Sequence, residues 1–149
     1  QPGDLHVQWR VEYAPGTLTA ISRKNGKKVL TKTIQTASEP ARLELVPDKK
    51  ILHANGQDLS FITIRVVDDR GNLVPDAAHQ LNFEIKGNGT FAGADNGYSA
   101  SHESFKALSH KAYNGMCVAI IQSTKKAGPI QLTVHAQGLP SRTVLLQNR

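Results

Sequence analysis

The stretch that decides the fold is SFITIRVV, residues 60–67, in which apolar and polar side chains alternate. Successive side chains of an extended strand point to opposite faces, so the alternation places Ile62, Ile64 and Val66 together on one face. The turn-forming sequence DDRGN, residues 68–72, follows directly. We therefore expect a half-buried β-strand that ends in a tight turn.

Similar short segments occur on both sides of this strand. Leu81, Phe83 and Ile85 alternate with polar residues, and a Gly-Asn-Gly turn leads from them into a short strand at 90–92. Further strands are expected at 42–46, 116–123, 130–136 and 142–146. No segment longer than a turn has the period of a helix, and about seven short strands in roughly 110 residues are typical of an immunoglobulin-like sandwich. Residues 39–149 are thus predicted to form an all-β, immunoglobulin-like antiparallel β-sandwich.

The first part of the chain shows a second β pattern. HVQWRVEY, residues 6–13, alternates strictly and would place Trp9 and Tyr13 on one apolar face with two valines. Two more strands, 17–22 and 28–36, flank an Asn-Gly hairpin turn.

Three strands bury too little surface to fold alone. We therefore expect residues 1–38 to be the truncated C-terminal part of a preceding β-sandwich domain, a three-stranded remnant. In this interpretation Trp9 and Tyr13 are candidates for packing between domains.

Composition excludes several classes of protein. The net charge is +6, but the lysines form small groups beside turns, where they protect sheet edges, so we expect no nucleic-acid partner. No apolar run approaches the roughly 18 to 20 residues of a membrane span, and no membrane insertion is expected. The single cysteine, Cys117, allows no intrachain disulfide, and its apolar neighbours predict a buried, inert thiol.

Several motifs together resemble a known family. WRVEYAPGTLTA, residues 9–20, resembles the end of a β-sandwich domain that follows the catalytic barrel in bacterial family 2 glycoside hydrolases of the β-galactosidase type. The later motifs NGQDLSF, VDDRGNLVPDA, GADNG and YNG resemble the immunoglobulin-like domain that closes many of these enzymes; they are residues 55–61, 67–77, 93–97 and 113–115.

The resemblance implies a parent enzyme that degrades β-galactosides or related sugars and is exported to the periplasm, the cell surface or the medium. It also implies that the partners of this chain are the catalytic and other domains of the same polypeptide. A retaining glycosidase needs two carboxyl groups about 5 to 5.5 Å apart, and in this family they come from a (β/α)₈ barrel of about 250 residues. No family catalytic motif matches here, so we expect a non-catalytic accessory or scaffolding region with no catalytic residue and no cofactor.

A long polar loop, residues 94–111, is the segment with the most site-like composition. It offers carboxylate, amide, imidazole and aromatic groups suited either to a glycan or to a neighbouring domain, from Asp95, Asn96, Tyr98, His102 and Phe105. A loop held together by its own Asx turns is the third interpretation.

The residues also bear on a metal site and on two other classes of protein. Neither a calcium-loop pattern nor histidines at ligand spacing occur, so no metal site is predicted. A bacterial immunoglobulin-like adhesion module of the invasin type fits the stretch from Asn55 to Pro75, but it offers no counterpart to residues 9–20. A carbohydrate-binding module would need a row of exposed aromatic residues, and the chain has few aromatics.

Overall fold

The structure is a computed structural model that describes residues 8–149. The chain divides into two compact units, the first ending at Thr36 and the second comprising Ala37–Arg149. Each unit is described by itself.

The first unit contains a β-hairpin. Strands β1 (Thr17–Lys24) and β2 (Lys27–Gln35) pair in antiparallel register, with Leu18 opposite Ile34. The turn residues Asn25 and Gly26 have φ angles of 51° and 75°, the left-handed conformation that Asn-Gly hairpin turns adopt. Every residue of both strands is exposed.

The strand predicted at residues 6–13 is wrong over the part that the structure describes. Gln8–Tyr13 form no strand, and His6 and Val7 lie outside the described residues. Trp9 and Tyr13 are 72% and 81% exposed, so the predicted inward face is not buried in this chain. Alternation alone does not make a strand, because a strand also needs a neighbour that takes up its backbone hydrogen bonds. The described part of the first unit is therefore two-stranded, not three-stranded.

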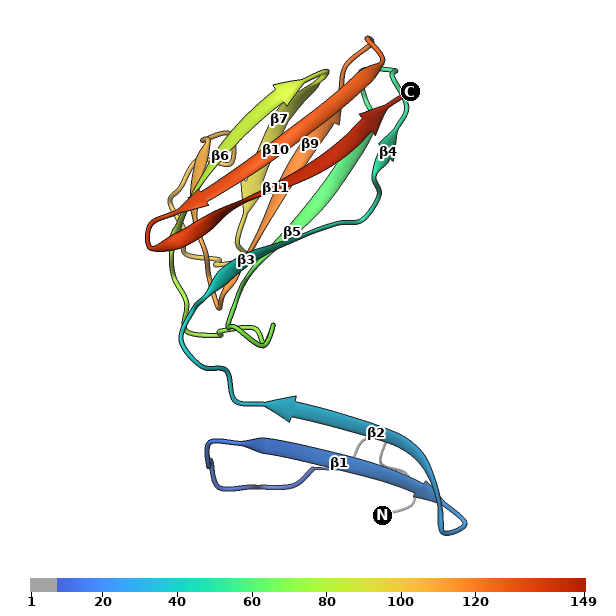
Figure 1. The fold of residues 1–149 in the computed structure, drawn as a ribbon, viewed down its shortest axis with the longest axis vertical. Coiled ribbons are helices and arrows are strands. Elements are labelled where there is room, and N and C mark those ends of the chain that lie inside the picture. Colours follow the sequence, from blue (N-terminus) through green and yellow to red (C-terminus); the bar gives the residue numbers. More distant parts are fainter. Residues whose placement is uncertain (1–7) are drawn as a thin grey trace. The chain divides into compact units, whose positions relative to one another are not determined.

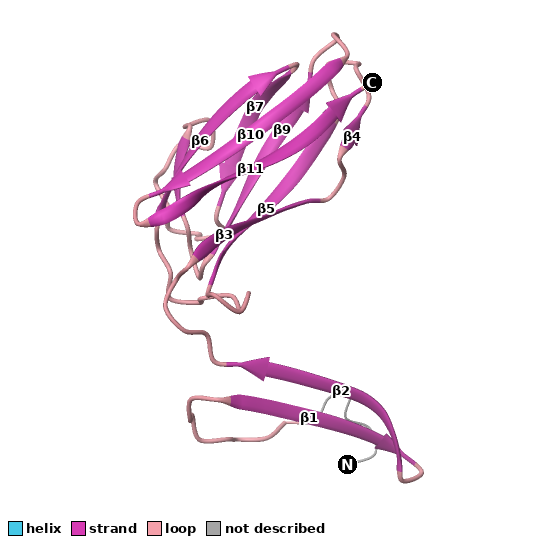
Figure 2. Ribbon diagram, viewed as in Figure 1, coloured by secondary structure: helices cyan, strands magenta, loops and turns pink. Residues whose placement is uncertain are grey.

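The second unit is a sandwich of two sheets (Figures 1 and 2). One sheet has the order β4-β11-β10-β6-β8 and the other the order β3-β5-β9-β7. The first sheet is formed by β4 (Ile51–Leu52), β6 (Gln80–Gly87), β8 (Ser109–Lys111), β10 (Gly128–Ala136) and β11 (Leu139–Asn148). The second is formed by β3 (Arg42–Pro47), β5 (Leu59–Val67), β7 (Gly89–Asp95) and β9 (Met116–Ser123). This arrangement confirms the predicted all-β, immunoglobulin-like sandwich.

The core lies between the two sheets and follows the predicted alternation. Ile62, Ile64 and Val66 of β5 have no exposed surface; alternate residues of β9 lie beside them in the same sheet, and alternate residues of β10 face them from the other sheet. The rings of Phe83 and Phe91 stack with centroids 5.1 Å apart. The full set of deeply buried hydrophobic residues begins at Leu43 and ends at Leu146.

Cys117 belongs to this core. Its side chain is 1% exposed, and burial raises the pKa of its thiol to about 12. The predicted burial of this thiol is confirmed, and the raised pKa disfavours the thiolate, which is the reactive form.

Two short strands were not expected from sequence. β4 pairs in parallel with the last strand, Ile51 opposite Gln147, and β8 pairs with β6. The loop predicted at 94–111 is correspondingly shorter, because β7 runs to Asp95 and β8 begins at Ser109. Within the described residues, no helix has the length and apolar character that crossing a membrane requires.

Candidate functional site

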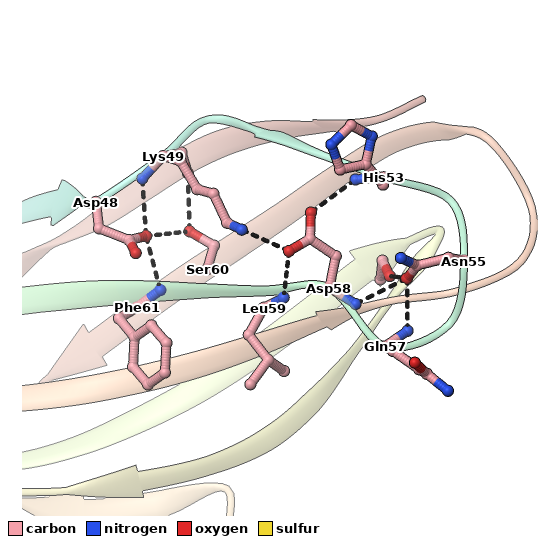
Figure 3. Close-up of polar contacts among 10 residues, drawn as sticks. Asp48, Lys49, His53, Asn55, Gln57, Asp58, Leu59, Ser60 and Phe61 are labelled. Carbon is pink, nitrogen blue, oxygen red and sulfur yellow. Dashed lines mark hydrogen bonds and ion pairs between the residues drawn. The ribbon is translucent and has the colours of Figure 1, made fainter.

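The connection from β3 to β5 carries a polar network built around two aspartates (Figure 3). Asp58 accepts hydrogen bonds from the Lys49 ammonium group, from the His53 N–H at 2.8 Å and from the Leu59 N–H at 3.0 Å. The Lys49 bond and these backbone bonds lower the pKa of Asp58 to about 2. Asp48 accepts from the Phe61 N–H at 2.9 Å. This network fixes the start of β5, so it is structural.

A second network holds the turn after β5. The Asp68 carboxylate has no exposed surface and accepts from the Asn72 N–H at 2.7 Å, the Arg70 N–H at 3.0 Å and the Ser38 N–H at 3.0 Å. Burial opposes ionisation here, but the Asn72 side chain and these N–H groups outweigh it and hold the pKa of Asp68 well below its usual range. The tight turn predicted at residues 68–72 is confirmed.

The loop between β7 and β8, residues 96–108, is organised by its own hydrogen bonds. Asn96 accepts from the Tyr98 N–H at 2.9 Å and donates its amide to the Lys111 carbonyl at 2.9 Å. Asp95 accepts from the Gly97 N–H at 3.1 Å. The bonds that Asp95 and Asn96 accept from the N–H groups two residues later are Asx turns, which the sequence allowed.

The middle of the loop is tied to β8 by Glu103. Its two oxygens accept from the Lys111 N–H at 3.1 and 3.2 Å, and its Oε2 lies 2.7 Å from Nδ1 of His110, a residue that is only 2% exposed. Burial opposes ionisation of Glu103, but the Lys111 N–H, the Gln80 amide and His110 keep its pKa below the ordinary value. Glu103 therefore clamps the loop to the sheet as a carboxylate.

An open depression of about 270 Å³ lies along this loop. Its lining includes Asp95, Tyr98, Glu103, Phe105 and His110. The Tyr98 ring packs against a tyrosine that precedes β9, Tyr113, with centroids 4.8 Å apart.

The structure thus brings together three of the five residues predicted as contacts. Asp95, Tyr98 and Phe105 line the depression. Asn96 instead forms hydrogen bonds within this region, and His102 is exposed outside the depression. Whether these five residues contact a glycan or another domain stays a prediction, as does a packing role for Trp9 and Tyr13.

Glu103 and His110 lie within the loop predicted at 94–111 but were not among the five predicted contact residues, and Tyr113 lies outside that loop. The pairing of β8 with β6 and the return of the chain into β9 bring them to the loop. No local pattern signals the contact of Tyr98 with Tyr113, because it depends on how the strands pair.

The sandwich and the first part of the chain each match a known protein family. Residues 43–145, most of the sandwich, match the family described as glycoside hydrolase family 2 C-terminal domain 5. The chain belongs to glycoside hydrolase family 2. Residues 1–30 match a second family, described as a domain of unknown function (DUF4982).

Relatives of this family 2 domain are much longer proteins. Over 136 residues the chain is 48% identical to beta-galactosidase BoGH2A of Bacteroides ovatus, covering 91% of this chain and 16% of the relative. It is 30% identical over 130 residues to a beta-galactosidase of Thermoanaerobacter pseudethanolicus, covering 87% of this chain and again 16% of the relative. The chain therefore spans less than a fifth of the curated relatives that it matches.

Solved structures agree with the family assignment. A glycosyl hydrolase family 2 member from Bacteroides cellulosilyticus superposes with a TM-score of 0.91 at 33% identity, over 95% of this chain and 18% of that one. The D00-D0 domain of intimin superposes with a TM-score of 0.55 at 13% identity, over 91% of this chain and 66% of that one. The intimin likeness shows the fold alone, so the adhesion alternative is not favoured.

Proposed function

We propose that this chain is the non-catalytic accessory region of a β-galactosidase-type family 2 glycosidase. In this role it stabilises and positions the larger catalytic portion of the same polypeptide. The observation that carries the proposal is the family match over residues 43–145. This match corresponds to a single domain, whereas the relatives are about six times longer than this chain. The names of those relatives point to β-galactosides as the substrate class of the parent enzyme.

The state of the carboxylates supports a non-catalytic role. A glycosidase general acid needs a raised pKa so that it holds a proton near neutral pH. Among the described residues, four carboxyl groups have a displaced pKa, and all four are displaced downward: Asp58, Asp68, Glu84 and Glu103. Each accepts hydrogen bonds within the domain. They act as structural acceptors, and the catalytic pair belongs elsewhere in the parent.

For the loop at 96–108, contact with protein is favoured over contact with a glycan. A sugar site needs free polar atoms beside its aromatic surface. Here Glu103 and Asn96 direct their oxygens and amide to the domain itself, while Tyr98 and Phe105 expose aromatic surface.

The first experiment identifies the parent. Antibodies raised against this chain are used to purify the full-length protein, which is then sized and assayed on aryl β-galactosides beside the isolated chain. We expect a polypeptide several times longer than this chain that hydrolyses the substrate, and no hydrolysis by the chain alone. A surface-anchored repeat protein without glycosidase activity would contradict the proposal.

A further inference from the structure

The outer faces of the two sheets differ sharply in chemistry. On the five-stranded sheet, the outward positions are mostly polar or charged: Asn82, Glu84, Lys86, Gln131, Thr133, His135, Thr143, Leu145 and Gln147. Such a face is suited to water, as is usual for one side of an antiparallel sandwich. Its large apolar residues are Leu145 and, at the sheet edge opposite Gln147, Ile51, which are 63% and 53% exposed.

The outer face of the four-stranded sheet carries a cluster of apolar side chains. Ile62, Ile64 and Cys117 point into the core, so their sequence neighbours point outward. We call five of these outward residues the apolar face: Val46, Phe61, Met116, Val118 and Ile120. Val46, Phe61 and Met116 are 47%, 43% and 38% exposed.

Strand register makes these residues neighbours. Phe61 lies opposite Ile120, and Thr63 lies between Val46 on one side and Val118 on the other. Directly paired residues of adjacent strands have Cβ atoms about 4.5 to 5.5 Å apart, so Phe61 and Ile120 are direct neighbours, whereas Val46 and Val118 flank Thr63.

The same surface continues to the loop. Tyr113 and Met116 form a β-bridge, which directs both side chains to the same face, and Tyr98 packs on the Tyr113 ring. Arg65 and Glu44 on this face form an ion pair, with 2.7 Å between the guanidinium nitrogen and the carboxylate oxygen, so their charges offset each other. The result is a largely apolar surface three strands wide, with an ion pair beside Met116, Arg42 at the start of β3 and two tyrosines at one end.

We propose that the apolar face, together with Tyr98 and Tyr113, is the surface on which this domain packs against the rest of its own polypeptide. A contiguous apolar surface of this kind marks a protein contact, because leaving it in water forgoes the free energy of burial. The occupant follows from the relatives, in which the matched span is only 16% of the chain. A tethered partner is present at high effective concentration, which favours it over a second molecule.

This inference rests on the proposed function, because it takes its occupant from the longer glycosidase. Pairing at the sheet edge is a weaker route to the same partner, since edge strand β3 ends in Pro47, which has no N–H to donate. Contact through the face therefore fits the residues better than strand addition.

Hydroxyl-radical footprinting with mass spectrometry tests the proposal on the full-length parent and on this chain. Met116 is the only methionine of the chain, so its oxidation reports on the apolar face without ambiguity. We expect oxidation of Met116 and Phe61 to be several-fold slower in the parent than in the isolated chain. Leu145, 63% exposed on the opposite sheet, should react equally in both and is the matched control.

A pair of variants gives a second measurement. Phe61→Lys places a charge on the apolar face, whereas Leu145→Lys places one on the polar sheet. In the isolated chain both should leave the unfolding temperature nearly unchanged, because both side chains point to water. In the parent only Phe61→Lys should lower it, because an unpaired ammonium group would be buried.

The outcomes separate cleanly. Equal oxidation of Met116 in the parent and in the isolated chain would overturn the inference. Protection of Met116 in the isolated chain that disappears on dilution would also overturn it, because the occupant would then be a second copy of the chain. The glycosidase activity of the parent is measured separately. An inactive parent with protected Met116 would therefore overturn the proposed function while supporting this docking face.

Discussion

Asp58 closes the turn before β5 as a carboxylate, and this makes the stability of the chain depend on pH. Its pKa is lowered from 3.8 to about 2, chiefly by the Lys49 ammonium group and the His53 N–H. A group with a depressed pKa in the folded state contributes stability above its unfolded pKa and loses it as pH falls through the folded value. Urea denaturation midpoints should therefore fall between pH 4 and 2, and Asp58→Asn should remove part of that dependence.

The matched control is Asp76→Asn, at an exposed position in the turn that follows Pro75. It should leave the acid dependence as it is in the unmodified chain. If Asp58→Asn and Asp76→Asn give the same midpoints from pH 5 downward, the hydrogen bonds at Asp58 do not set its protonation.

Substitutions at two glycines, Gly115 and Gly97, distinguish the cost of backbone strain from the cost of steric overlap. Gly115 and Gly97 have φ angles of 72° and 75°, so alanine is strained at both. A Cβ on Gly115 would lie 2.3 Å from the Val74 carbonyl oxygen, whereas a Cβ on Gly97 would meet nothing within 4 Å. We expect Gly115→Ala to lower the free energy of unfolding by about 2 to 3 kcal/mol and Gly97→Ala by about 1 kcal/mol. Equal losses in urea denaturation would show that φ alone matters.

At the scale of elements, the loop at 96–108 depends on its clamp to β8. Glu103→Ala removes the acceptor of the Lys111 N–H, so amide exchange of Lys111 and of the loop should accelerate. The overall loss should be small, about 1 kcal/mol. Since the pKa of Glu103 is lowered from its ordinary value of 4.5, the clamp should persist to a lower pH than an unperturbed glutamate would allow and open as pH falls further. His102→Ala, beside it and exposed, should leave exchange unchanged.

At the scale of the whole molecule, the sandwich should fold without the hairpin. The core cluster draws its residues from Ala37 onward, and β1 and β2 are exposed throughout. A chain of residues 37–149 should therefore unfold in urea with the same midpoint and slope as the full chain, measured by circular dichroism. Trp9 is the only tryptophan, and its fluorescence should be that of an exposed residue and should not change during this unfolding transition. A lower midpoint for 37–149 would show that the hairpin contributes to the sandwich.

The sequence by itself determined those features that depend on neighbours along the chain. The alternation at Ile62, Ile64 and Val66 predicted both the strand and its buried face, since the side-chain period of a strand is two. Asn25-Gly26 predicted the hairpin, and the sequence DDRGN predicted the tight turn after β5, because turn chemistry is local. The family could also be inferred, because its motifs lie mainly in such turns.

Only the tertiary structure decided which distant segments meet. Residues 8–13 alternate as well as β5 does, yet they form no strand, because a strand needs a partner for its N–H and C=O groups. β4 exists because the last strand lies beside it, and Glu103 reaches His110 because β8 pairs with β6. The apolar face likewise arises from the register of three strands, since Val46, Phe61 and Ile120 are isolated apolar residues in the sequence and neighbours only in the folded sheet.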